Sequence, residues 1–181
     1  MATVKILNVE YDVKTTIELD LSNKELREIP EGVFELENLE ILYLDDNIIY
    51  KIPSEIGSLK KLKELNLGMN NISETPAEIG NLENLKDLNL SGNQITEIPK
   101  EIDNLINLKE LDLSDNKITT IPKELGNLIN LNSLYLTDNK IIKIPKEIGK
   151  LKNLIYLILS NNKITTIPKK IYGIKNLTII I

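Results

Sequence analysis

The apolar positions of the chain repeat with a fixed period of 23 residues, from residue 16 to residue 176. In the central unit, LKELDLSDNKITTIPKELGNLIN (residues 108–130), Leu111 and Leu113 alternate with Glu110 and Asp112. Such an alternation predicts a short strand with one face turned inward and the other outward. The prolines keep the same period: Pro30, Pro53, Pro76, Pro99, Pro122, Pro145 and Pro168. A constant period of this length predicts a solenoid in which each unit stacks on the next.

The second half of each unit predicts a turn followed by a short helical segment. Asn116 stands at the bend after the strand, where its amide can bond backbone groups that a curving chain leaves unpaired. The first unit has Lys24 at this position, so we expect its turn to differ. Pro122 suits the first position of a short helix, and Leu125 and Leu128 return to the core. We expect the equivalents of Asn116 to stack as a ladder: Asn47, Asn70, Asn93, Asn139 and Asn162.

With its pattern L-x-x-L-x-L-x-x-N-x-I, the chain resembles the leucine-rich repeat (LRR) family over residues 16–181. It is most similar to the 23-residue class with Ile-Pro after the turn, found in bacterial and intracellular eukaryotic LRR proteins. The resemblance implies an α/β solenoid: a horseshoe segment with a parallel β-sheet on the concave side and short helical or 3-10 segments on the convex side. Such segments are usually used for protein recognition. We expect an N-terminal cap (residues 1–15, a strand or hairpin), seven repeats (16–176) and the start of an eighth (177–181).

Composition narrows the function classes. Hydrophobic residues make up 41% and charged residues 27% of the chain, which is typical of a globular protein. Neither a signal peptide nor a membrane-spanning stretch is present in this sequence, so we expect a cytoplasmic protein that does not bind membranes. The net charge of −5 argues against nucleic acid and anionic lipid as partners.

Catalysis has little support in these residues. The chain has neither His nor Cys, which excludes a His-based triad and a thiol nucleophile. Glu110 and Asp112 are a conceivable acid/base pair, but we expect both on a shallow, exposed face with no cause for a shifted pKa. No Gly-rich phosphate loop occurs, and the ligand spacing of a calcium loop is absent. We therefore predict a non-enzymatic protein without a cofactor or a metal site.

The outward strand positions form two rows. The first row is Glu18, Ile41, Glu64, Asp87, Glu110, Ser133 and Tyr156. The second row is Asp20, Tyr43, Asn66, Asn89, Asp112, Tyr135 and Ile158. The centre is acidic, and like charges about 5 Å apart repel by about 0.8 kcal/mol even in water. Two interpretations stay open: a surface for a basic partner, or a solvated strand face whose repulsion is relieved by Lys63, Lys86 and Lys109.

Apolar residues gather at the C-terminal end of these rows. Tyr135, Tyr156 and Ile158 are expected to be close neighbours, with Ile155, Ile179 and Ile181 nearby, and Tyr43 forms a smaller patch with Ile41. A contiguous exposed apolar surface indicates an interface, and Tyr is favoured at binding hot spots. The alternative is that the C-terminal patch is covered by another chain or by further sequence.

We therefore predict an interaction module that binds a protein or peptide, with basic groups favoured, on its concave face. The predicted contact residues are Tyr43, Glu64, Asp87, Glu110, Asp112, Tyr135, Tyr156 and Ile158. The alternative is a structural or self-assembling unit. In that case the edge strand at Leu177–Ile181 joins copies as a homodimer.

Overall fold

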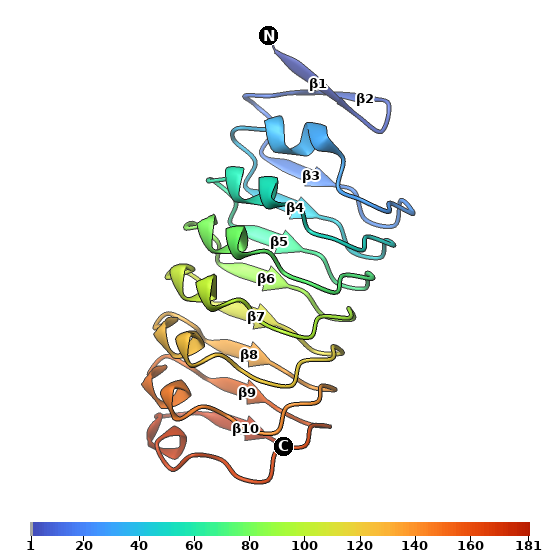
Figure 1. Cartoon of the computed structure of the whole chain (residues 1–181). Helices are drawn as coiled ribbons and strands as arrows, with labels where there is room; N and C mark the ends of the chain where they lie inside the picture. Colours follow the sequence, from blue (N-terminus) through green and yellow to red (C-terminus); the bar gives the residue numbers. More distant parts are fainter. Residues whose placement is uncertain (1) are drawn as a thin grey trace.

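One parallel β-sheet runs the length of the molecule. The computed structural model describes residues 2–181, and Figure 1 shows the repeats stacked from β3 to β10. The eight strands pair in sequence order. They are β3 (Glu18–Asp20), β4 (Ile41–Tyr43), β5 (Glu64–Asn66), β6 (Asp87–Asn89), β7 (Glu110–Asp112), β8 (Ser133–Tyr135), β9 (Tyr156–Ile158) and β10 (Thr178–Ile180). This arrangement confirms the α/β solenoid, with the sheet on its concave side.

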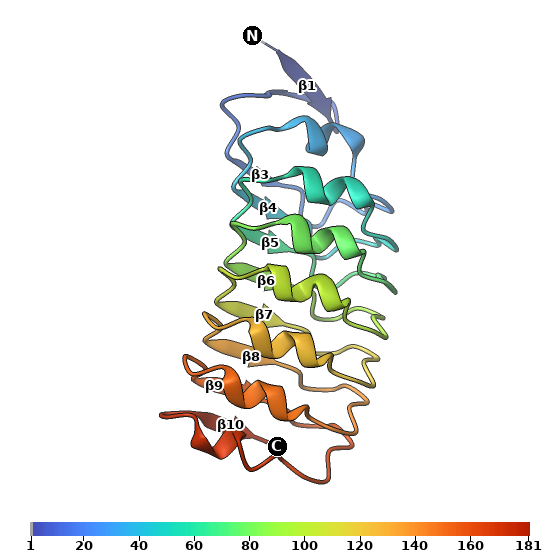
Figure 2. The same cartoon turned by 60° about the vertical axis from the view of Figure 1, so that its left-hand side comes forward.

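Short 3-10 helices cover the opposite, convex side, as Figure 2 shows. They are η1 (Glu31–Glu35), η2 (Ser54–Ser58), η3 (Ala77–Asn81), η4 (Lys100–Asn104), η5 (Lys123–Asn127), η6 (Lys146–Lys150) and η7 (Ile171–Gly173). The prediction that Pro122 occupies the first helical position is wrong. Pro122 precedes η5 and has an extended backbone (φ −65°, ψ 141°). Its carbonyl oxygen accepts the first helical hydrogen bond from the Leu125 N–H at 3.2 Å. The ring therefore fixes the approach to the helix.

The core is continuous along the solenoid. In the central unit Leu111, Leu125 and Leu128 are fully buried and Leu113 is almost so, as the alternation predicts. Their equivalents in the other repeats belong to the same buried cluster. Each repeat therefore buries its apolar face only by contact with its neighbours, which is the reason for stacking.

The predicted asparagine ladder is confirmed. The Nδ2 atom of Asn70 donates to the carbonyl oxygens of Leu44, Leu67 and Gly68 at 3.0–3.1 Å. Its Oδ1 atom accepts a hydrogen bond from the N–H of Ile49, in the preceding repeat, at 2.9 Å. Each amide thus joins two repeats and satisfies backbone groups that would otherwise be unpaired inside the bend.

The first turn differs from the others, as expected from Lys24. Asn23 adopts positive φ (53°), like Asp46 one repeat later, but Glu25 adds a second positive φ (55°) that the other repeats lack. The N–H groups of Lys24 and Leu26 both donate to Oδ1 of Asn47. The ladder therefore reaches the first repeat although this repeat has no asparagine at the ladder position.

A hairpin precedes the repeats. β1 (Thr3–Ile6) and β2 (Val9–Asp12) form an antiparallel pair, and the turn between them uses positive φ at Leu7 and Asn8. Val4 and Ile6 are buried in the same cluster as the core of the first repeat. They pack on Gly32 within η1, where a Cβ atom would lie 2.6 Å from the Val4 side chain.

The last strand departs from the 23-residue period by one residue. Ile179 lies opposite the inward Leu157, and Ile180 lies opposite the outward Ile158. A strict period places Ile179 in the outward row, so the prediction that it flanks the concave tyrosines is wrong. Positive φ (59°) at Asn176 marks the point where the chain enters the strand early. Since side chains alternate between faces, this shift turns Ile179 to the core and Ile180 outward.

Candidate functional site

The register of the sheet brings the eight predicted contact residues onto one surface. Glu64 lies beside Asp87, Asp87 beside Glu110, and Asp112 beside Tyr135 on adjacent strands. Tyr135 is in turn the neighbour of Ile158, and Tyr43 and Tyr156 extend the two rows. Because each strand contributes the same two outward positions, the two rows are as predicted. Their role in binding stays a prediction.

The centre of this surface is a shallow acidic hollow of about 270 Å³, which we call the acidic hollow. Glu64, Asp87, Glu110 and Asp112 line it together with Asn66 and Asn89. The carboxylates come from the three neighbouring strands β5, β6 and β7. Strands spaced about 4.8 Å apart hold these like charges close together with no main-chain freedom to separate them.

The carboxyl groups of the acidic hollow respond to this crowding. Partial burial raises the pKa of Asp87, and the Glu64 carboxylate raises it further. Partial burial also raises the pKa of Glu110, with additional contributions from Asp87 and Asp112. The expectation that Glu110 has no cause for a shifted pKa is therefore wrong. Neighbouring strands both remove water from the carboxylate and set other charges beside it.

The flanking lysines contribute unequally. Lys63 forms an ion pair with Glu40 at 2.7 Å, in the same column one repeat earlier. Lys109 and Lys86 instead lower the pKa of Asp87, although less than burial raises it. The predicted relief of repulsion therefore comes from the later two lysines, and the acidic hollow keeps an excess of negative charge.

Polar groups at the strand ends already hold the adjoining loops. Asn66, Asn89 and Asp112 accept hydrogen bonds through Oδ1 from backbone N–H groups two residues later, at 2.9–3.0 Å. One carboxylate oxygen of Asp112 therefore already accepts a hydrogen bond from the Ser114 N–H, and the other oxygen is available to a binding partner. Sequence reasoning missed this role. The signal was present, because Asx residues commonly accept such bonds where a turn begins.

An apolar surface adjoins the acidic hollow at the C-terminal end of the sheet. We call it the apolar patch; it consists of Tyr135, Ile155, Tyr156, Ile158 and Ile180. Tyr156, Ile155 and Ile180 expose 45%, 42% and 48% of their surface, while Tyr135 and Ile158 are half-buried. Sequence reasoning missed Ile180, because only the shifted register of β10 places it beside Ile158. Tyr135, Ile158 and Ile180 are neighbours on β8, β9 and β10, so the apolar surface is contiguous there, with Ile180 in the place predicted for Ile179.

Tyr43 stands at the other end of the acidic hollow. It is half-buried in the second row, beside Asn66 of β5. Hydrogen bonding to Glu64 raises the pKa of its phenol, and loss of water around the ring adds to the shift. Tyr43 is thereby linked to the acidic hollow, and it does not belong to the apolar patch.

Within residues 2–181, no group of three or more His, Cys, Asp or Glu side chains is arranged to hold a metal ion. No helix among the same residues is long and apolar enough to cross a membrane.

Comparison with known proteins gives one family. The Leucine rich repeat model matches residues 14–72, 37–95, 60–118, 83–141 and 129–181. No curated protein matches the chain significantly. Solved structures do match. The structure of the plant peptide hormone receptor RGFR1 in complex with RGF2 has 35% identity, a TM-score of 0.79, and a match over 85% of this chain and 26% of that one.

Two bacterial structures are also similar. An LRR protein of Leptospira interrogans has 32% identity and a TM-score of 0.70, over 93% of this chain and 55% of that one. An internalin of Listeria monocytogenes has 30% identity and a TM-score of 0.74, over 84% of this chain and 44% of that one. The chain thus spans between about a quarter and just over half of the length of these three proteins.

Proposed function

Since the chain belongs to the leucine-rich repeat family, we propose that it is a non-enzymatic interaction module that binds a protein or peptide on its concave face. The observation that carries this proposal is the apolar patch: Tyr156 and Ile180 are exposed there, and Tyr135 of the same patch lies beside Asp112 of the acidic hollow. Exposed contiguous apolar surface of this kind marks interaction sites on soluble proteins. We also propose a cytoplasmic location, because a chain with no Cys fits a reducing compartment.

The two surfaces have different tasks in this proposal. Tyr135, Tyr156 and Ile158 provide the area that a partner buries, because aromatic side chains dominate binding energy at the centre of interfaces. Glu64, Asp87 and Glu110 favour partners with basic groups and accelerate the encounter with them. The similar receptor structure, described as a peptide hormone receptor in complex with RGF2, supports a peptide as one kind of partner.

The test begins with peptides selected from a displayed random library against the wild-type chain. Their affinity is then measured for the double variant Tyr135→Ala/Tyr156→Ala. A matched control is Ile106→Ala/Ile129→Ala, which removes two apolar side chains that are 56% and 59% exposed outside the concave rows. We expect the tyrosine variant to lose most binding and the isoleucine variant to keep it. Equal affinities for both variants refute the concave site.

A second candidate function is self-association through β10. This strand lies at the edge of the eight-stranded sheet, and Ile180 and Ile181 expose 48% and 68% of their surface. Edge strands present unpaired backbone groups that favour pairing with another strand. Light scattering over a concentration series tests this candidate. A dimer that Ile180→Lys/Ile181→Lys abolishes supports it, and a monomer at all concentrations counts against it.

A further inference from the structure

Charge is distributed very unevenly along the solenoid. Residues 140–181 contain nine lysines and one acidic residue, Glu147, so their net charge is +8. Residues 1–139 contain 13 basic and 26 acidic residues, a net charge of −13. The total of −5 conceals this asymmetry. A basic end on an acidic protein indicates an electrostatic interaction surface.

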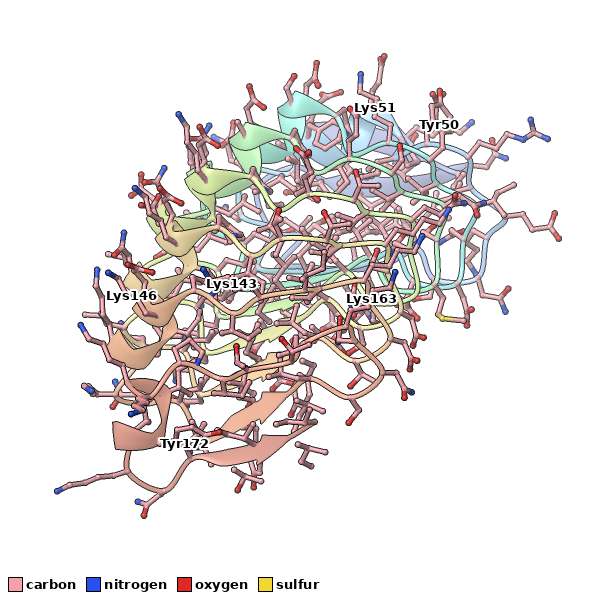
Figure 3. All side chains as sticks on the ribbon, turned by 60° about the horizontal axis from the view of Figure 1, so that its bottom comes forward. Tyr50, Lys51, Lys143, Lys146, Lys163 and Tyr172 are labelled. Carbon is pink, nitrogen blue, oxygen red and sulfur yellow. The ribbon has the colours of Figure 1, made fainter. Side chains whose placement is uncertain are left out.

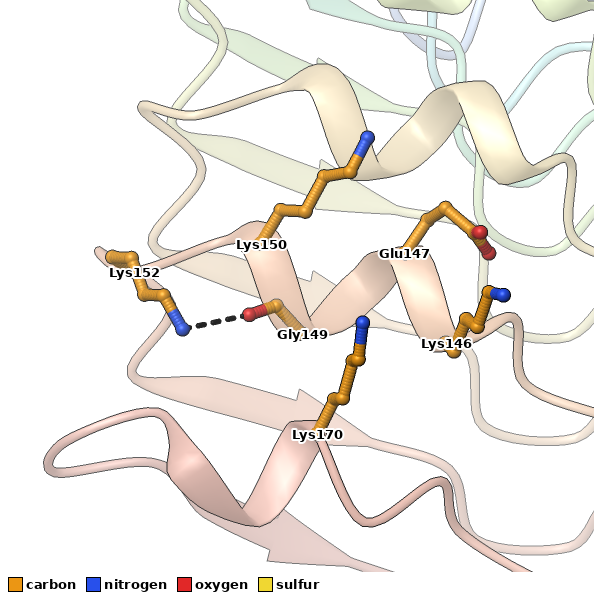
Figure 4. Close-up of a pocket in the computed structure, with 6 residues that line it drawn as sticks. All are labelled: Lys146, Glu147, Gly149, Lys150, Lys152 and Lys170. Carbon is orange, nitrogen blue, oxygen red and sulfur yellow. Dashed lines mark hydrogen bonds between the residues drawn. The ribbon is translucent and has the colours of Figure 1, made fainter.

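Part of this basic end surrounds a hollow on the convex side, which we call the lysine hollow. Lys146, Lys150, Lys152 and Lys170 line its volume of about 410 Å³ together with Glu147 and Gly149. Figure 4 shows the lysines projecting around η6 and from the turn before η7. Lys152 donates a hydrogen bond to the Gly149 carbonyl oxygen at 2.9 Å. None of the four ammonium groups forms an ion pair with a residue in the range 2–181.

Lys170 breaks a pattern that the five repeats before it keep. Lys170 immediately precedes η7. The equivalent residue in repeats two to six is a glutamate, the second residue of each 3-10 helix: Glu55, Glu78, Glu101, Glu124 and Glu147. The last repeat therefore replaces an acidic column on the convex side by a positive charge. Lys150 likewise replaces the Asn or Ser of earlier repeats, at Asn127, Asn104, Asn81 and Ser58. Both replacements fall at the lysine hollow.

A second hollow of about 610 Å³ adjoins the first and shares Lys146 and Glu147 with it. We call it the apolar hollow, because half of the residues that line it are apolar: Ile121, Ile142, Ile144, Pro145 and Pro168. Ile142 exposes 61% of its surface, at a position where the neighbouring repeats carry threonine. Figure 3 shows Lys143 and Lys146 on the same flank of the solenoid. Positive charge and apolar area are therefore contiguous here.

We propose that the lysine hollow and the apolar hollow together are a second interaction surface, which binds a short acidic polypeptide segment carrying an apolar side chain. Carboxylates of the segment pair with Lys146, Lys150 and Lys170, and its apolar side chain packs against Ile142 in the adjoining hollow. Charge selects the segment and the apolar contact contributes buried area. This surface lies outside the concave rows, so it does not depend on the function proposed for them.

The rest of the molecule favours a short segment over an extended polyanion. A membrane or a nucleic acid duplex presents negative charge over an area much wider than two repeats. Such a surface would also face residues 1–139, whose net charge is −13. Like charges repel over a Debye length of about 8 Å at physiological salt. A short acidic segment can occupy the two hollows and avoid this repulsion.

The test uses a fluorescein-labelled peptide of repeated Glu-Glu-Leu triplets, with fluorescence anisotropy as the readout. The charge-reversal variant is Lys146→Glu/Lys150→Glu/Lys170→Glu. Its matched control, Lys60→Glu/Lys61→Glu/Lys100→Glu, changes the net charge by the same amount at exposed lysines of earlier repeats. We expect the first variant to weaken binding at least about tenfold, because three exposed charge pairs are lost and reversed. The control variant should bind within about twofold of wild type.

Two further comparisons complete the test. Ile142→Ser, or a peptide of Glu-Glu-Ser triplets, should weaken binding, and Tyr135→Ala/Tyr156→Ala should leave it unchanged. Equal loss in the two lysine variants, or no effect of Ile142→Ser, overturns the proposal. It is also overturned if phosphatidylserine vesicles bind the wild-type chain and the acidic peptide does not, since the lysines then serve a membrane surface.

Discussion

The asparagine ladder provides a sharp test of what stabilises this solenoid. Asn93 is buried, with 7% of its surface exposed. Its Nδ2 atom donates to the carbonyl oxygens of Leu67 and Leu90 at 3.0 Å and of Ser91 at 3.1 Å. Its Oδ1 atom accepts from the Ile72 N–H at 3.0 Å. The substitution Asn93→Ala removes all four hydrogen bonds and keeps the backbone.

The consequences for the two sides of the amide differ. The carbonyl oxygen of Leu67 keeps a bond from Asn70, that of Leu90 keeps one from Asn116, and that of Ser91 keeps one from the Met69 N–H. The Ile72 N–H is left without a partner in the interior. A buried unsatisfied group costs about 1–3 kcal/mol, and the lost bonds add about 1 kcal/mol. We therefore expect Asn93→Ala to lower the free energy of unfolding by about 2–4 kcal/mol.

A second asparagine column supplies the control. Asn84, Asn107, Asn130 and Asn153 each donate one exposed hydrogen bond to a carbonyl oxygen of the previous repeat, at 2.7–2.8 Å. Asn107→Ala removes one such bond and leaves no buried group unpaired. We expect a loss of about 0.5–1 kcal/mol. The side-chain change is identical, so helix or strand propensity does not distinguish the two variants.

Urea unfolding followed by circular dichroism measures both values by linear extrapolation. Repeat proteins can unfold in parts, so the slope of the transition is compared with that of wild type before the free energies are subtracted. The reasoning is refuted if Asn93→Ala costs less than about 1 kcal/mol, or no more than Asn107→Ala. In that case water replaces the amide, and the ladder is a consequence of the bend.

Other predictions concern packing and charge. Gly126→Ala should destabilise the fold by about 1–3 kcal/mol, because the new Cβ atom would lie 2.5 Å from a carbonyl oxygen of the next repeat. Gly173 faces open space, so Gly173→Ala should leave the free energy of unfolding unchanged in the same urea assay. If the β1–β2 hairpin shields the end of the core, Ile6→Ala should lower the free energy of unfolding by about 2–4 kcal/mol, because Ile6 is buried. Leu7 is 44% exposed, so Leu7→Ala should lower it by less than about 0.5 kcal/mol. Equal losses for the two variants contradict this role of the hairpin. Asp87→Asn should raise the thermal midpoint at neutral pH, because a folded-state pKa above the unfolded value means that ionisation opposes folding. The gain should disappear as the pH falls below the unfolded pKa of about 3.9, and a constant gain at all pH values would point to a cause other than charge.

The sequence by itself determined the solenoid and the composition of its concave face. Units of equal length place equivalent residues side by side, so Glu64, Asp87 and Glu110 had to share a row once each unit formed a strand. The same argument gave the ladder at Asn70 and Asn93. Alternation along each strand then separated core from surface. These features depend on local periodicity, which can be read from the sequence alone.

Tertiary structure decided what depends on actual distances and solvent access. The register of β10 turned Ile179 inward and Ile180 outward, against the period, because the chain enters that strand one residue early. The ion pair between Lys63 and Glu40 and the raised pKa of Glu110 depend on neighbours in other repeats. The lysine hollow, too, exists only where the convex segments of successive repeats meet, and the apolar hollow only where the segments before the helices meet. The period of the sequence shows which residues are neighbours. Side-chain rotamers, burial and the packing of adjacent repeats decide whether those neighbours form an ion pair, shift a pKa or line a hollow.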